Sequence, residues 1–276
     1  MAPSFGRSIS FPLSPARSSK PRAAAAAYHV RSISLPCRSH PLLAHLQTHT
    51  AAARAWALNP TAASPSSGLA HIDALHAALT ELLLLPEPQA AVRAASSDRL
   101  LDAFLLLADA HRGFHEVLLT LRSDAADVRA ALRRRDAARL ASAVRSQRRN
   151  EKELARLAAT VSSIALNSKC ARLGFAGATA EETEMAAALM DAAAASAAAS
   201  AAVFSAAASV SAAASSSKKT ATFVAFTKKA DTADVEPEKL EELEQCIDEC
   251  ESGSEMVFRS IVRTRVSLLN IRTPAI

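Results

Sequence analysis

The sequence predicts an all-α protein, an elongated helical bundle with a coiled-coil-like C-terminal helix and a disordered N-terminal arm. Alanine occupies 65 of the 276 positions, whereas there are only 6 Gly, 1 Trp and 1 Tyr. Ala is the best helix former, and sheets are built from β-branched and aromatic residues. This composition therefore disfavours sandwiches, barrels and doubly wound sheets. Apolar residues also recur at helical spacing in several segments.

The first 40 residues differ in composition from the rest of the chain. The first 27 residues are rich in Ser, Arg, Pro and Ala, and the first acidic residue of the sequence is Asp73. The density of proline excludes regular helix, and the composition is typical of either a transit peptide or a disordered regulatory arm. We therefore expect an arm, residues 1–40, and a helical bundle domain, residues 41–276.

Two helices are expected at the start of the domain. The first covers residues 41–58, with Pro41 in an early helical position where a missing N–H costs little. The second runs from about residue 69 to 85, because Leu residues recur on one face and Pro86 and Pro88 then end the helix.

The middle of the chain predicts further helices with less definite ends. Ser97 is a plausible N-cap for a third helix and Asp124 for a fourth. The basic run 133–135 is either a break or a continuous surface turn. Beyond it, apolar residues recur at a heptad-compatible spacing: Leu140, Leu154, Leu157, Val161 and Ile164.

An alanine-rich helix is expected after residue 179. Thr179 and Glu182 form a capping-box pattern before it. The uncharged run 192–217 consists mostly of Ala and Ser, which give little energy for membrane insertion, so it indicates a helix and not a membrane anchor. Its small side chains suit close helix approach, and a low-complexity insert with little tertiary role has the same composition.

The last helix has the clearest pattern. Pro237 suits its first turn, and a 3–4 spacing continues for four heptads. An intramolecular bundle helix is favoured over a coiled-coil strand that pairs with another chain. Nine positions form the seam: Leu240, Leu243, Ile247, Cys250, Ser254, Val257, Ile261, Thr264 and Leu268.

Charge is distributed in blocks along the chain. Residues 129–156 carry a net charge of +7 and residues 231–255 a net charge of −10. Opposite charges on helices of similar length predict that the two segments lie side by side, with two solvated faces that never meet as the alternative.

The sequence shows no pattern typical of catalysis. It lacks a Gly-rich phosphate loop, a GxSxG elbow and an HExxH motif. His111 and His115 share a helical face but are expected to pack and not to bind metal, and Cys246 and Cys250 are expected in the core. We expect no enzymatic activity and no cofactor. The four cysteines show no framework spacing, which indicates a reducing compartment.

A basic surface is the main candidate binding site. The segment 129–156 has no aromatic residue to stack on bases, so nucleic acid is not the expected partner. An anionic membrane surface is the stronger alternative. The candidate residues are Arg133, Arg134, Arg135, Arg145, Arg148 and Arg149.

A short motif occurs twice in the arm, as RSISFP at 7–12 and RSISLP at 31–36. Ser10 and Ser34 are candidate phosphosites, and Arg7, Pro12, Arg31 and Pro36 supply the docking context. The phosphorylated motif resembles the RSxSxP ligands of 14-3-3 proteins, in which an Arg cluster binds the phosphate. Chance matches in a region crowded with Arg, Ser and Pro are the alternative.

Two terminal blocks carry a family resemblance. YHVRSISLPCRSHP at 28–41 and RTRVSLLNI at 263–271 resemble the end signatures of the plant domain-of-unknown-function 241 family, the BYPASS-like proteins. Between them, LLDAFLLLADAHRGFHEVLL at 100–119 and LEQCIDECESGSEMVF at 243–258 fall in the family order. The resemblance implies an all-helical plant protein without established catalytic activity, linked to root and shoot development.

The expected function follows from the residue patterns and from the family resemblance. We expect a non-enzymatic plant protein that acts through protein partners, with a peripheral membrane protein that uses 129–156 as the alternative. Because the family block begins at Tyr28, we expect the arm to be retained and the protein to be cytoplasmic. A plastid location is the alternative if the arm is a transit peptide.

Overall fold

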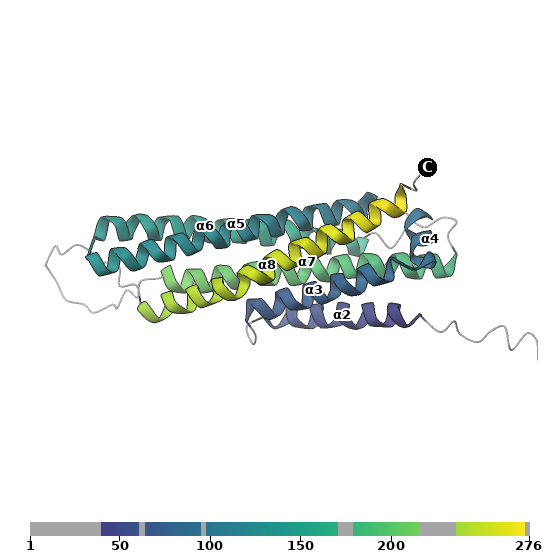
Figure 1. The fold of residues 1–276 in the computed structure, drawn as a ribbon, viewed down its shortest axis with the longest axis horizontal. Coiled ribbons are helices and arrows are strands. Elements are labelled where there is room, and N and C mark those ends of the chain that lie inside the picture. The colour runs from purple at the N-terminus through teal and green to yellow at the C-terminus, as the bar shows by residue number, and fades with distance from the viewer. Residues whose placement is uncertain (1–39, 61–63, 95–97, 171–178, 216–235, 274–276) are drawn as a thin grey trace, which may run out of the picture. The chain divides into compact units, whose positions relative to one another are not determined.

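A computed structural model describes residues 40–60, 64–94, 98–170, 179–215 and 236–273. All of these residues belong to one compact unit, His40–Ile276. The described residues form helices and no strand (Figure 1), which confirms the predicted all-α helical bundle. The helices are α2 (Pro41–Leu58), α3 (Pro65–Leu82), α4 (Pro86–Ala94), α5 (Asp98–Arg134), α6 (Ala137–Cys170), α7 (Ala180–Ser215) and α8 (Pro237–Arg272).

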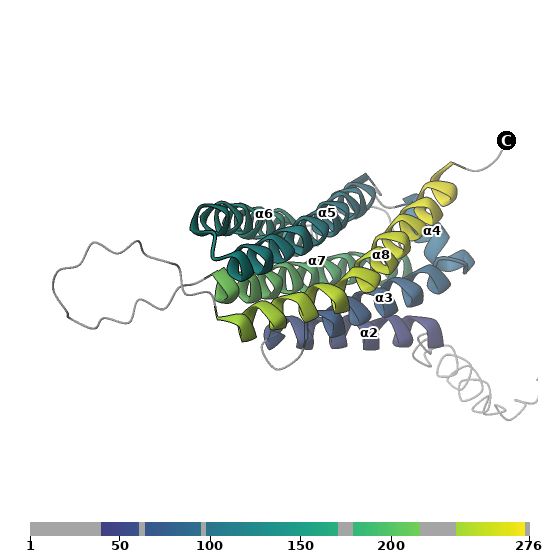
Figure 2. The same cartoon turned by 60° about the vertical axis from the view of Figure 1, so that its left-hand side comes forward.

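The alanine-rich α7 is the central helix of the bundle. It packs against each of the other six described helices. Figures 1 and 2 show it between the α5–α6 pair and the α2–α3 pair. Between Ala192 and Ser200 almost every side chain is buried, so the small residues form a packing surface and the insert interpretation is wrong.

The length and apolar composition of α7 are explained by its central position in the bundle. Among the described helices it alone is long and apolar enough by itself to cross a membrane, and 56% of its most apolar window is buried inside the bundle. Core helices of soluble proteins meet the same criterion. The burial of Ala193, Ala195 and Ala199 accounts for the composition of α7 without a membrane.

The seam of α8 is buried as predicted. All nine positions are buried, and α8 packs on α5 and α3 of the same chain. The helix runs antiparallel to α5, because Asp98 pairs with Arg272 at one end and Arg129 with Glu244 at the other. The seam therefore has intramolecular partners, as favoured from the sequence.

Two helix boundaries near the N-terminus differ from expectation. The first helix is confirmed at Pro41–Leu58, but α3 begins at Pro65, because the Ser64 hydroxyl accepts a hydrogen bond from the Ser66 N–H and Pro65 suits the first turn. Pro86 was expected only to end the second helix. It begins α4, a short helix that the sequence analysis missed, and α4 is bent by 93° from α3.

The expected helix start at Asp124 is wrong. Asp124 lies inside α5, which continues without a break from Asp98 to Arg134. Its carboxylate accepts a hydrogen bond from Asn150 Nδ2 on α6 at 2.8 Å, so it contacts a neighbouring helix and caps none. Ser97 lies outside the described residues.

The capping box before α7 is confirmed. The Thr179 N–H donates to Glu182 Oε2 at 2.9 Å, and the Glu182 N–H donates to Thr179 Oγ1 at 3.2 Å. This reciprocal pair satisfies two backbone donors that the start of a helix leaves free.

Candidate functional site

The basic run 133–135 forms a sharp break between α5 and α6. The Arg135 N–H donates to Leu132 O at 3.2 Å and the Asp136 N–H donates to Ala131 O at 3.0 Å, the two bonds of a Schellman motif. Arg135 has φ 54°, in the left-handed region that favours glycine. Asp136 then caps α6, because its Oδ1 accepts from the N–H groups of Ala138 and Arg139, both at 3.1 Å. A helical hairpin results.

This hairpin carries a concentrated positive charge, which we call the arginine end. Figures 1 and 2 show α5 and α6 side by side. Three of the arginines lie at the turn, and three lie two to three turns further along α6. All are exposed, and none forms an ion pair with another described residue. The arginine end consists of Arg133, Arg134, Arg135, Arg145, Arg148 and Arg149.

A polar groove runs between α5 and α6 below the turn. Its volume is about 380 Å³. Each helix contributes residues at the same 3–4–3 spacing, so one face of α5 opposes one face of α6. The α5 side has Asp124, Asp127, Ala131 and Arg134, and the α6 side has Arg139, Ser142, Ser146 and Arg149.

Asp124 lines the groove and is hydrogen-bonded to side chains of α6. Burial raises the pKa of its carboxyl group, whereas hydrogen bonds from Ser146 and Asn150 act in the opposite direction. The carboxylate is fixed by these neighbours before any ligand arrives. Arg139, Ser142 and Ser146 were not predicted as site residues, because their spacing becomes a signal only when α6 is known to oppose α5.

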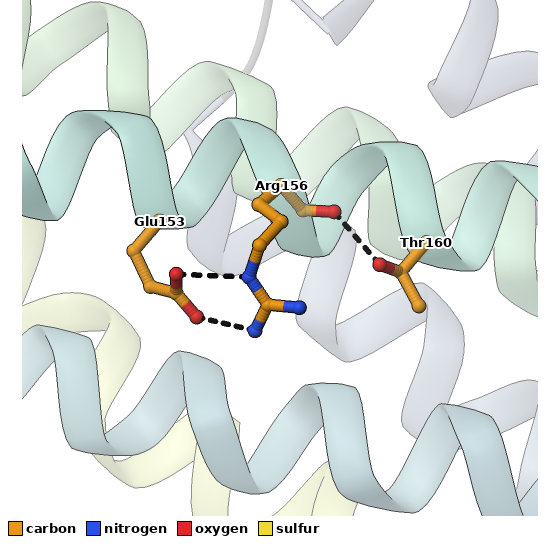
Figure 3. Close-up of polar contacts among 3 residues, drawn as sticks. All are labelled: Glu153, Arg156 and Thr160. Atoms are coloured by element: carbon orange, nitrogen blue, oxygen red, sulfur yellow. Dashed lines mark hydrogen bonds and ion pairs between the residues drawn. The ribbon is translucent and has the colours of Figure 1, made fainter.

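Arg156, the last residue of the basic segment, is already neutralised. Its guanidinium donates to both carboxylate oxygens of Glu153, from Nε to Oε2 at 2.9 Å and from Nη2 to Oε1 at 2.5 Å (Figure 3). The Arg156 hydrogen bond lowers the pKa of Glu153. Both residues lie on α6, and Thr160 Oγ1 donates to the Arg156 carbonyl (Figure 3). Arg156 therefore does not add to the free charge of the arginine end.

The acidic segment meets the basic segment only in part. Arg129, the first residue of the basic segment, pairs with Glu244 of α8, whereas Arg122, which pairs with Asp248 and Glu251, precedes the segment on α5. The expectation that the two segments lie side by side is wrong for Arg145, Arg148 and Arg149 and the described part of the acidic segment, because these arginines lie on α6, which packs on α5 and α7. Residues 231–235 lie outside the described residues.

A second polar cluster lies inside the bundle around two buried histidines. Thr264 Oγ1 donates to Ser260 O and therefore accepts from His76 Nδ1 at 3.1 Å. The proton on Nδ1 leaves His76 Nε2 as the acceptor from Ser196 Oγ at 2.9 Å. In this hydrogen-bond assignment His76 is neutral, and burial lowers its pKa to about 3.

His111 makes a similar contact one turn along α7. Ser200 Oγ donates to Ser196 O and therefore accepts from His111 Nε2 at 2.8 Å. Burial lowers the pKa of His111 to about 3, and its Nδ1 has no hydrogen-bond partner among the described residues. The structure thus places His111 in the core, packed edge-to-face on Phe204.

This buried cluster joins α3, α5 and α8 to α7. Neither the α5–α6 groove nor a mainly apolar groove between α2 and α7 is lined by His76 or His111. Within the described ranges, no group of three or more His, Cys, Asp or Glu side chains is placed to hold a metal ion. Cys246 and Cys250 are free and buried in α8, as expected.

The paired RSIS motifs fall in residues 1–39, outside the described residues. The candidates there are Arg7, Ser10, Pro12, Arg31, Ser34 and Pro36. Phosphorylation-dependent docking therefore stays a prediction.

The fold and this surface define an all-α protein whose buried histidines contact hydroxyl groups of a neighbouring helix and whose α5–α6 hairpin carries six exposed arginines. Residues 68–271 match the family described as Protein BPS1, and the chain belongs to this family. The match confirms the resemblance to BYPASS-like plant proteins. No curated protein and no solved structure matches the chain.

Proposed function

We propose that the protein is a non-enzymatic BYPASS-like protein that acts through protein partners in root and shoot development. The arginine end carries this proposal, because six exposed cations lie on one hairpin without ion pairs among the described residues. Like charges held close together repel each other, so an acidic partner surface would be attracted and steered to this end. Membership of the BPS1 family supports the developmental setting.

The buried polar groups support the non-enzymatic part of the proposal. His76 engages Thr264 and Ser196 through its two ring nitrogens, and Ser200 is committed to His111 and Ser196. Groups engaged in this way specify helix packing and are not free to act as acid or base toward a substrate.

The test is affinity purification from root and shoot tissue. The first variant carries Gln in place of the outer arginines of the arginine end: Arg133, Arg135, Arg145 and Arg148. A control carries Gln in place of four exposed arginines elsewhere, of which Arg112 and Arg259 form ion pairs within their helices, so it removes the same formal charge: Arg99, Arg112, Arg259 and Arg263. We expect a partner that is lost with the first variant and kept with the control, and loss of developmental rescue by the first variant alone. Identical partners for both variants would contradict the proposal.

A peripheral membrane protein is the second candidate, because the same exposed charge suits an anionic lipid surface. The apolar side chains of the segment, including Leu140, Val144 and Leu154, are buried in the bundle. Contact with a membrane would therefore be electrostatic, without an inserted apolar face. Sedimentation with phosphatidylserine vesicles across a salt series tests this candidate, and binding that persists at high salt would contradict an electrostatic contact.

A further inference from the structure

We propose that the groove between α5 and α6 binds a phosphorylated polyol of the inositol phosphate class. This inference goes beyond the proposed function: it concerns the groove between the helices, and its cations Arg134 and Arg149 belong to the arginine end but are not among the four arginines replaced in the test above.

Cations lie at both ends of the groove. Arg134 and Arg139 flank the turn, and Arg149 lies ten residues along α6 from Arg139, which corresponds to about 15 Å of helix. Arg139 is partly engaged with Asp136 at 3.5 Å, so Arg134 and Arg149 are the two guanidinium groups of the groove that form no ion pair with another described residue, and the charge of Arg149 also acts on Asp124. Guanidinium groups bind phosphate oxygens in a bidentate manner, and their separation favours a ligand with more than one phosphate.

The middle of the groove has a different chemistry. It presents the hydroxyl of Ser142 and the carboxylate of Asp127, beside the Ser146 hydroxyl that is hydrogen-bonded to Asp124. A carboxylate repels a simple polyanion, but it accepts hydrogen bonds from the hydroxyl groups of a polyol. Cations at the ends with hydroxyls and a carboxylate between them therefore match a ring that carries both phosphate and hydroxyl groups.

The groove is also shaped before a ligand arrives. Asp124 is held by Asn150 at 2.8 Å, and the Schellman turn fixes the separation of the two helices. A rigid site loses less freedom on binding than a flexible one, which favours affinity. The groove volume of about 380 Å³ accommodates a single phosphorylated ring.

The first experiment is calorimetric titration of the full chain with myo-inositol 1,4,5-trisphosphate, with myo-inositol and inorganic phosphate as comparisons. We expect the trisphosphate to bind at least about tenfold more tightly than inorganic phosphate, since one phosphate cannot reach both ends. Equal affinity for the two probes, or no binding of the trisphosphate, would overturn the proposal.

Variants then distinguish binding in the groove from unspecific electrostatic attraction to the hairpin. Replacement of Arg134 and Arg149 by Gln should weaken trisphosphate binding by about tenfold or more. The matched control replaces Arg145 and Arg148, which carry the same charge on the same hairpin outside the groove, and should change binding by less than about threefold. Equal losses in the two variants would show unspecific attraction and overturn the groove assignment.

Asp127→Ala tests the polyol part. A site for a simple anion should bind the trisphosphate more tightly when this carboxylate is removed, whereas a polyol site should bind it more weakly. Tighter binding would overturn the polyol assignment.

Vesicles that contain phosphatidylinositol 4,5-bisphosphate identify the source of the ligand. If the soluble trisphosphate displaces the protein from these vesicles, the groove binds the lipid headgroup. If vesicles fail to bind while the soluble probe binds, the ligand is the free polyol phosphate.

Discussion

His76 Nε2 lies 2.9 Å from the hydroxyl oxygen of Ser196, and this contact joins α3 to the centre of α7. The contact of His111 with Ser200 joins α5 to the same helix one turn further on. An alanine surface is almost featureless, so apolar packing alone sets the position of a neighbouring helix only loosely. Two directional hydrogen bonds fix the register of α3 and α5 along α7.

The two histidines should make stability depend on pH. Both are neutral in the fold with a pKa of about 3, whereas a histidine in the unfolded chain ionises near pH 6.5. The unfolded state therefore binds more protons between these values, so their contribution is complete above pH 6.5 and is lost as the pH falls toward 3. Each should contribute a slope of about 1.4 kcal/mol per pH unit within this window.

His111→Gln provides the measurement, because the Gln amide can still donate to Ser200. Urea unfolding at pH 7, 6, 5 and 4 should show a smaller pH slope for this variant than for the wild type. His40→Asn, which removes an exposed histidine and keeps a cap, should leave the slope unchanged. Equal slopes for wild type and His111→Gln would show that His111 is accessible to protons in the fold.

Ile247 should be central to the stability of α8. Its side chain is buried at 2% exposure, so Ile247→Ala should lower the free energy of unfolding by about 2–5 kcal/mol. Val262→Ala on the outer face of the same helix should cost much less, since Val262 is 37% exposed. Denaturant unfolding compares the two variants. Similar losses in the free energy of unfolding would show that Ile247 does not lie in the buried seam of α8.

Arg129 and Glu244 should be energetically coupled. Both side chains are partly exposed, at 44% and 28%, so solvent screens the pair and the coupling should be about 0.2–1 kcal/mol. A double-mutant cycle with Arg129→Gln and Glu244→Gln measures it. The same cycle with Arg145 in place of Arg129 should give additive effects, and coupling there would contradict the observed packing of α8 on α5.

Arg135→Gly should stabilise the protein. A left-handed backbone costs a non-Gly residue about 1–2 kcal/mol, and the greater freedom of Gly in the unfolded chain offsets part of the gain. We expect a net increase of about 0.5–1 kcal/mol in the free energy of unfolding. Arg133→Gly at a helical position should instead lower stability, by up to about 1 kcal/mol. A loss of stability for Arg135→Gly would show that the Arg135 side chain makes a stabilising contact.

Gly68→Ala should destabilise the α2–α3 contact although Ala is the better helix former. A Cβ atom at position 68 would overlap the ring of Trp56, which is rigid and hydrogen-bonded through Nε1 to Ser67. We expect a loss of about 1–3 kcal/mol. Trp56 is the only Trp of the sequence, so its fluorescence reports the change directly.

Gly113→Ala is the matched control for this substitution. Its Cβ would meet only the methyl groups of Leu157 at 3.3 Å, and these can rotate away. Its stability should be unchanged or raised. A gain for Gly68→Ala as well would show that the Trp56 ring has room to move.

Elements with local signals could be predicted from the sequence. The α8 seam follows from spacing alone, and the Thr179–Glu182 box needs only residues of one turn. Asp124 shows where local reasoning fails, because a capping residue and a residue that binds a neighbouring helix look the same in sequence. A break at the basic run 133–135 remained one of two alternatives, because no glycine marks the left-handed position that Arg135 occupies. The groove depends on the register between α5 and α6, which that turn sets.

The alanine-rich helix α7 at the centre of the bundle has a thermodynamic consequence. An Ala side chain has no rotamers to lose, so the segment around Ala193, Ala195 and Ala197 is ordered at the cost of backbone freedom alone. The leucines and phenylalanines of the surrounding helices supply most of the apolar area, and they also bear most of the side-chain entropy loss. The entropy cost of ordering side chains is therefore smallest at the centre of the bundle and rises outward toward its neighbours.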